Sequence, residues 1–214
     1  MIGKLIGKPV AFLFKPVHTK AGRALAIAAL AVSLAGCGAV MVQNPSSSLK
    51  PVNATADAQS GEPLMLKGAD VVAYWTMSKY VQGKPEIKSD YEGVTFRFSS
   101  AEHKALFDKE PKKYLPEFGG YCADGLVYAI PWGGDADTWS MLNGKLYIFG
   151  GQSSKDAFEL NVPRNLELST KYWNEEVAGN NSFFQRMKRL TFKVSHYKSG
   201  GDLAKEVAEA KAKK

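Results

Sequence analysis

The chain has 214 residues, of which 45% are hydrophobic and 23% are charged, which is the composition of an ordinary globular protein and not of a disordered or fibrous one. Its formal net charge of +7 is concentrated at the N-terminus, because residues 1–36 hold five cations and no acid. Without that segment, 23 cations face 21 anions. A balance this even argues against nucleic-acid binding, which requires a clustered basic surface on the folded domain, so no nucleic-acid partner is expected.

The N-terminus has the pattern of a secretion signal. Ala24–Gly36 is an uncharged stretch of 13 residues, shorter than the roughly 20 apolar residues of a membrane-spanning helix, and basic residues precede it. It runs into Leu34-Ala35-Gly36-Cys37, which resembles the lipobox of bacterial lipoproteins. The resemblance implies cleavage before Cys37 and acylation there with diacylglycerol and palmitate, which would anchor the chain to a membrane. An uncleaved anchor and a plain secretory signal are the alternatives.

The residue after this cysteine is Gly38 and not Asp, which in lipoproteins favours the outer membrane. We therefore expect residues 1–36 to be a signal peptide and the remaining chain to face the periplasm of a bacterial cell envelope. Residues 37–61 are rich in Ser, Asn, Ala, Pro and Gln without hydrophobic periodicity, which is typical of a flexible tether. The domain is expected at residues 62–178, followed by a basic C-terminal extension at 179–214.

Hydrophobic periodicity predicts the elements of the domain. Strands are expected at 70–75, 91–98, 126–130, 138–142 and 145–149, and helices from Ser99 or Ser100 to before Pro111, at 153–160, at 163–177 and, weakly, at 202–214. The Asn143-Gly144 pair between two hydrophobic runs is the strongest hairpin signal in the chain. This mixture indicates an α+β fold, a small single domain of hairpin strands with short helices packed on one side.

The chain has two cysteines, Cys37 and Cys122. Lipidation of Cys37 would leave Cys122 without an intramolecular partner in an oxidising compartment. Cys122 is then expected to be buried, bound to a metal, paired with another molecule, or reactive.

Several stretches of the chain together resemble the YHS domain family, in its bacterial secreted form with a single cysteine. The residues that carry the resemblance are Tyr91–His103, Phe107, Pro111, Tyr114–Pro116, Gly119–Ala123, Trp139, Asn143–Tyr147, Val162-Pro163, Asn165 and Trp173. The resemblance covers roughly residues 66–177, and it is specific because many unlike residues agree in order and spacing.

The YHS resemblance implies metal binding, with copper as the suspected metal. Family members suspected of binding metal carry a pair of cysteines at the positions that here hold Ser99 and His103. The remaining candidates form a site of Cys122 and His103, completed by Met141, Tyr121 or water, and suited to Cu(I) or Zn(II). A metal-exchange protein would be its partner. In the alternative interpretation, Cys122 packs in the core as a small hydrophobic residue.

No enzyme signature is present: nucleophile-elbow, HExxH, CxxC and phosphate-loop patterns are all missing, so binding is expected in place of catalysis. A different hypothesis is a structural or interaction lipoprotein whose basic tail, residues 186–214, meets the envelope surface. Another is a thiol-dependent redox protein, which requires a lowered pKa at Cys122. The aromatic residues offer a further option, a ligand pocket lined by some of Trp75, Trp132, Trp139 and Trp173.

Overall fold

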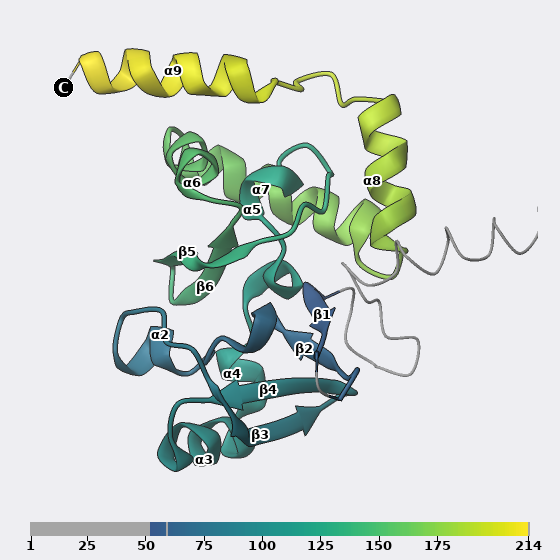
Figure 1. Cartoon of the computed structure of the whole chain (residues 1–214). Coiled ribbons are helices and arrows are strands. Elements are labelled where there is room, and N and C mark those ends of the chain that lie inside the picture. The colour runs from purple at the N-terminus through teal and green to yellow at the C-terminus, as the bar shows by residue number, and fades with distance from the viewer. Residues whose placement is uncertain (1–51, 59, 214) are drawn as a thin grey trace, which may run out of the picture. The chain divides into compact units, whose positions relative to one another are not determined.

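The computed structural model describes residues 52–58 and 60–213. The expected signal peptide, Cys37 and the part of the tether before Val52 lie outside the described residues. The strands are β1 (Ala54–Ala56), β2 (Pro63–Met65), β3 (Lys84–Tyr91), β4 (Val94–Phe98), β5 (Asp135–Leu142) and β6 (Lys145–Phe149). The helices are α2 (Ala73–Thr76), α3 (Ala101–Lys109), α4 (Pro111–Tyr114), α5 (Ala123–Leu126), α6 (Gln152–Glu159), α7 (Val162–Tyr172), α8 (Ser182–Thr191) and α9 (Gly200–Ala212), and η4 (Trp173–Val177) is a π-helical turn after α7. This mixture of elements confirms the α+β class (Figure 1).

A mixed four-stranded sheet has the order β1-β2-β4-β3, in which only the β2–β4 pair is parallel. Its first strand lies in the segment expected to be tether, where Val52 and Ala54 are buried. The side chain of Asn53 fixes this segment, because its Nδ2 donates to the carbonyl oxygens of Gly120 at 3.0 Å and Gly134 at 2.9 Å. The folded domain therefore begins before the expected boundary at residue 62.

The predicted hairpin forms as β5 and β6 around Asn143 and Gly144, which both adopt positive φ. Alternate side chains of β6 point to opposite faces, as in any strand. Leu146 and Ile148 join a first core with the four-stranded sheet, whereas Tyr147 and Phe149 join a second core with the later helices. The hairpin therefore connects two cores.

The helices divide between these two cores (Figure 1). α3 packs on β3 and β4, where the ring of Phe107 contacts those of Phe96 and Phe98. α5, α6, α7 and η4 cover the hairpin's other face. The predicted limits of α3 are confirmed: the Ser100 hydroxyl caps it by accepting from the His103 N–H at 3.2 Å, and it ends before Pro111.

Two predicted strands are wrong. At 70–75 the chain forms a turn and α2 instead, because the Asp70 carboxylate accepts from the N–H groups of Val72 and Ala73 at 3.0 and 3.3 Å and so starts a helical turn. At 126–130 the chain forms the end of α5 and a buried turn, closed by Ile130 N–H donating to the Gly125 carbonyl at 3.0 Å. A short apolar run does not distinguish a strand from a buried helix or turn, because its composition reflects burial and not strand pairing.

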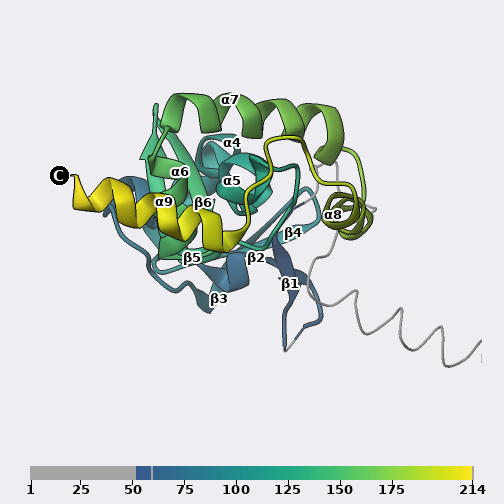
Figure 2. The same cartoon turned by 90° about the horizontal axis from the view of Figure 1, so that it is seen from above.

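The C-terminal extension forms helices that contact the domain (Figure 2). In α8, the Gln185 side chain donates to the Ala129 carbonyl at 3.1 Å. α9 packs against α6, where Lys211 pairs with Asp156 at 2.6 Å. Residues 179–213 therefore belong to the folded unit and contribute to the surface described next.

Candidate functional site

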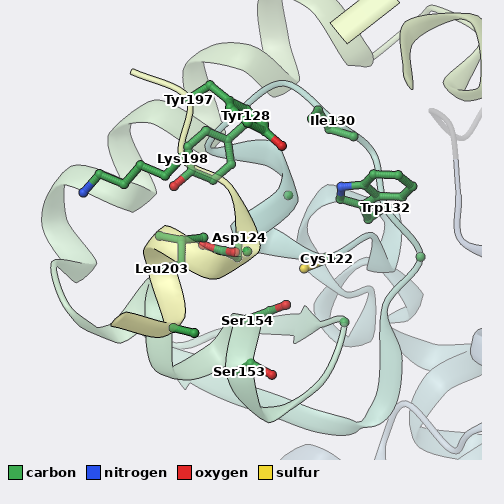
Figure 3. A pocket seen from close by; sticks show the side chains of 15 residues that line it. Cys122, Asp124, Tyr128, Ile130, Trp132, Ser153, Ser154, Tyr197, Lys198 and Leu203 are labelled. Carbon is green, nitrogen blue, oxygen red and sulfur yellow. The ribbon is translucent and has the colours of Figure 1, made fainter. Parts of the chain in front are cut away.

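A pocket of about 340 Å³ opens where α5, the loop between β6 and α6, and the start of α9 meet (Figure 3). This volume lies within the range typical of small-molecule sites. It is lined by Cys122, Asp124, Gly125, Tyr128, Ile130, Trp132, Gly133, Gly150, Ser153, Ser154, Tyr197, Lys198, Gly200, Leu203 and Ala204. Its walls thus combine a thiol, a carboxylate, hydroxyls and aromatic rings, which makes it the candidate site.

Backbone hydrogen bonds set the wall around α5. The Cys122 N–H donates to the Trp132 carbonyl at 2.9 Å, which fixes the indole-bearing residue beside the thiol. Gly125 allows this close approach, because a Cβ atom there would lie 2.6 Å from the Ile130 carbonyl oxygen and 2.9 Å from the Trp132 ring. The glycine after Asp124 is therefore needed for the pocket wall to close.

Asp124 is the unusual group of the pocket. It is only 8% exposed, and within residues 52–58 and 60–213 its carboxylate forms no hydrogen bond and no ion pair. Burial raises its pKa from 3.8 to about 7, because the carboxylate loses hydration without gaining a partner. An isolated buried carboxylate is costly, so Asp124 is poised to receive a positive charge or a hydrogen-bond donor from the pocket.

Cys122 is buried beside Asp124, with its sulfur between Asp124 and Trp132 in the view of Figure 3. Burial raises the pKa of its thiol, the Asp124 carboxylate raises it further, and hydrogen bonds from Gly125, Gly150 and Ser154 only partly offset this. The thiol therefore stays protonated at neutral pH. A protonated, buried thiol is a poor nucleophile.

Aromatic rings form much of the remaining wall, from Tyr128, Trp132 and Tyr197. The only cation among the lining residues is Lys198, which pairs with Glu206 at 2.6 Å and whose amino group points away from the pocket (Figure 3). The pocket interior therefore combines a buried anionic group with aromatic faces and no compensating cation from its own lining.

His103, the other predicted metal ligand, lies in a different cluster on the first core. Its Nδ1 is 2.6 Å from Asp70 Oδ2, and its Nε2 is 2.9 Å from the Thr76 hydroxyl. Ser99, the other position implied by the family, donates to the same Asp70 oxygen from its N–H at 2.8 Å and its hydroxyl at 2.6 Å. We call Asp70, Ser99, His103 and Thr76 the Asp70 cluster.

The structure does not bring the four predicted site residues together. His103 does not line the pocket of Cys122, and no hydrogen bond joins the two. Tyr121 is fully buried, with its hydroxyl 3.1 Å from the Val52 carbonyl oxygen. Met141 packs on the first core. Cys122 is thus the one predicted metal ligand in the pocket, and Trp132 is the one of the four tryptophans offered for a ligand pocket that lines it. The lipidation site Cys37 lies outside the described residues.

Sequence reasoning missed Asp124 and Ser154. Asp124 had a usable signal, because it is the only charged residue between Phe118 and Pro131, a stretch that is otherwise apolar and glycine-rich. A lone acid in such a stretch is buried with its neighbours and is a candidate for function. Ser154 carries no comparable signal, since its approach to the Cys122 sulfur depends on tertiary packing.

None of the helices in the described ranges is both long and apolar enough to cross a membrane. Those ranges also hold no cluster of three or more His, Cys, Asp or Glu side chains placed to bind a metal ion. Comparison of the chain with models of known protein families, with curated proteins and with solved structures finds no match.

Proposed function

We propose that this protein is a lipid-anchored envelope protein whose domain binds a small organic cation in the pocket at Asp124. The observation that carries the proposal is the buried carboxylate of Asp124, which faces the pocket with no partner among the described residues. A bound ammonium group would compensate the charge that burial otherwise disfavours.

The walls of the pocket fit the same class of ligand. The rings of Tyr128, Trp132 and Tyr197 line it, and aromatic faces attract ammonium groups. Trp132 already accepts such a contact on its ring from Arg186, whose guanidinium carbon lies 5.1 Å from the ring centroid. An amine or quaternary ammonium compound would thus meet a carboxylate and aromatic rings together, the combination that recognises organic cations.

The expected soft metal fits this pocket less well. Cu(I) favours two or more thiolate, thioether or imidazole ligands. The pocket supplies one thiol of raised pKa and one carboxylate, while His103 is held by Asp70 elsewhere. Copper or zinc binding through Cys122, with a metal-exchange partner, remains a prediction and forms one arm of the test below.

The redox alternative required a lowered thiol pKa at Cys122, and burial shifts the pKa in the opposite direction. A raised pKa disfavours the thiolate that would attack a disulfide. We therefore expect Cys122 to react with alkylating reagents only when the chain unfolds.

Calorimetric titration of the full chain tests the proposal, with choline, ethanolamine and putrescine as probes. We expect one equivalent of at least one probe to bind, and affinity to rise about tenfold per pH unit up to about pH 7, because binding requires the ionised Asp124. Asp124→Asn should abolish binding. Asp135→Asn, at an exposed acid outside the pocket, is the matched control and should bind as the unchanged chain does.

Absence of binding by all three probes at pH 8 would contradict the cation proposal. A parallel titration with Cu(I) and Zn(II), read by native mass spectrometry, decides the metal arm. If one metal ion binds tightly, and its binding is lost in Cys122→Ala and kept in Asp124→Asn, the ligand of the pocket is a metal ion and not an organic cation.

A further inference from the structure

α8 has its amphipathic faces reversed relative to an ordinary surface helix. The side turned to the domain is polar, with Ser182 and Gln185 buried. The side turned to solvent is apolar: Phe183, Met187 and Leu190, spaced by four and three residues, lie along one face. Exposed apolar side chains on and just after the helix are Phe183, Phe184, Met187, Leu190 and Phe192, here called the α8 apolar face.

This orientation is held by specific contacts and is not a loosely attached helix. Gln185 donates to the Ala129 carbonyl at 3.1 Å and to the Glu176 carboxylate at 2.9 Å. Arg189 forms an ion pair with Glu176, and Arg186 donates to the Pro131 carbonyl at 2.8 Å. Because the polar side is satisfied by the domain, rotating α8 to bury its apolar face would break all of these bonds.

The most exposed members of the face are the largest ones. Phe184 is 69% exposed and Phe192 is 70% exposed. Apolar side chains scattered singly on a surface need no explanation, but Phe183, Phe184, Met187 and Leu190 lie within three turns of one helix, and such a face marks an interaction site. The question is therefore what covers it.

The charge around the face favours an anionic surface. Between Glu176 and Asp202 the chain has five cations and no acid. Of these, Lys193 immediately follows Phe192 and is exposed, with its amino group 4.3 Å from the centroid of the Tyr197 ring. Lys188 borders the face with about half of its side chain exposed and pairs with Glu176 at 3.2 Å. A phenylalanine-rich helix face edged by lysines is the pattern of a helix that lies in the interface of an anionic membrane.

The path of the chain points the same way. Val52, where the described structure begins, is adjacent to the start of α8, because the Tyr121 hydroxyl lies 3.1 Å from the Val52 carbonyl oxygen and 3.0 Å from Ser182 Oγ. Only residues 38–51 separate Val52 from Cys37, a segment that spans at most about 50 Å. A lipid on Cys37 would therefore keep the domain within about 50 Å of the bilayer, with the tether joining it beside the start of α8.

We propose that the α8 apolar face lies on an anionic lipid membrane and fixes the orientation of the domain there. The lipid anchor of the proposed function would hold α8 close to the membrane, but the face is expected to insert without it, and the inference is independent of any ligand at Asp124. Phe184, Met187 and Phe192 enter the boundary between headgroups and acyl chains, while Lys188 and Lys193 meet the phosphates.

A local probe on the full chain tests this proposal, since the N-terminal segment could itself bind vesicles. In a Cys37→Ser background, Phe184→Cys is labelled with the polarity-sensitive dye NBD. Vesicles of phosphatidylcholine and phosphatidylglycerol should raise its emission and shift it to the blue. The matched control is Glu86→Cys, an exposed position on β3, a strand that lies away from α8 in Figure 1, and its emission should not change. The background chain without an added cysteine should take up no label, because Cys122 is buried.

Two substitutions separate the apolar and charged contributions. Lys193→Gln should lower the equilibrium constant for insertion of the labelled helix about fivefold, whereas Lys88→Gln on β3 should not change it. Met187→Asp should abolish insertion into these vesicles. Met187 lies outside the pocket lining, so Met187→Asp is not expected to change cation binding at Asp124, whereas Lys193 lies 4.3 Å from the centroid of the Tyr197 ring in the pocket wall. Failure of this proposal and failure of the ligand proposal are therefore distinguished with Met187→Asp.

Three outcomes would overturn the membrane proposal. One is an unchanged NBD spectrum in chains that float with the vesicles. Another is an apolar environment at position 184 without vesicles that depends on protein concentration, which would assign the face to a second copy of the chain. The last is an apolar environment without vesicles at every concentration, which would assign the face to residues 1–51 of the same chain.

Discussion

Two buried aspartates mark regions of this domain with opposite electrostatics. Asp70 is fully buried, and its carboxylate accepts from the N–H groups of Val72, Ala73 and Ser99, from the Ser99 hydroxyl and from His103. Asp124 is nearly as buried and forms no hydrogen bond or ion pair in the described part of the chain. The same side chain is therefore fully satisfied in one place and left open in the other.

The difference separates a structural role at Asp70 from the binding role proposed for Asp124. The Asp70 carboxylate joins the start of α2, the end of β4 and α3, so the fold supplies everything that a buried carboxylate needs. At Asp124 the fold supplies only burial, and a partner must come from the pocket. A buried polar group without a partner weakens a fold, and this cost is the physical basis of the ligand proposed for the pocket.

The same substitution at the two positions should change stability in opposite directions. Asp70→Asn puts an amide NH₂ where at least one carboxylate oxygen accepted hydrogen bonds, so donors face a donor in a buried site. We expect a loss of about 3 kcal/mol in the free energy of unfolding, measured with urea at pH 7. Glu86→Gln, at an exposed position, is the control. If Asp70→Asn lowers the free energy of unfolding no more than this control does, Asp70 has no structural role.

Asp124→Asn should instead stabilise the protein, and only above pH 4. The folded-state pKa of about 7 lies above the ordinary value of 3.8, so between these values the folded chain holds a proton that the unfolded chain has released. Stability then falls as pH rises through this range. Asparagine cannot ionise, so the gain should be roughly 2–4 kcal/mol at pH 8 and close to zero at pH 4.

Urea unfolding at both pH values checks this prediction. A saturating cation ligand should reduce the difference at pH 8, since it stabilises only the chain that keeps the carboxylate. Equal stability of the two chains at pH 8 without ligand would mean that Asp124 has a partner in solution, and the contrast with Asp70 would disappear.

The elements fixed by local signals could be predicted from the sequence. The β5–β6 hairpin follows from Asn143-Gly144, and α3 follows from its serine cap and from Pro111. The pairing of β1 and β2 with the sheet could not be predicted, since both strands have three residues and β2 meets β4 through a single register pair, Leu64 with Thr95. Strands this short carry no periodicity to recognise.

The candidate site was predictable only in part, and for a physical reason. Cys122 stood out as the cysteine left without a partner, and His103 was paired with it because both are capable metal ligands. The structure satisfies His103 with Asp70 instead, a contact between residues 33 positions apart in the sequence. Which of several distant polar groups meet is decided by packing, which no local pattern encodes.

Glu176, in η4, adds a third acid to the comparison, one whose carboxylate is satisfied by side chains of α8. Burial raises its pKa, but hydrogen bonds from Arg189, Gln185 and Lys188 outweigh burial and lower it from 4.5 to about 2. The resulting stabilisation is complete above pH 4.5 and is lost as pH falls through 2. Glu176→Gln should cost roughly 2 kcal/mol at pH 7 and almost nothing at pH 2, as measured by urea unfolding. A cost that does not depend on pH would show that the contacts of α8 do not depend on this charge.

Thr76→Val tests the outer edge of the Asp70 cluster and should have the smallest effect. The Thr76 hydroxyl lies 2.9 Å from His103 Nε2, but Thr76 is exposed, so water can replace the hydroxyl and valine keeps its shape. We expect a loss below about 1 kcal/mol in the free energy of unfolding. A loss as large as that of Asp70→Asn would extend the structural cluster to the surface. A small loss would show that the Asp70 cluster stabilises the fold through its buried contacts, where Asp70 holds Ser99 and His103 together.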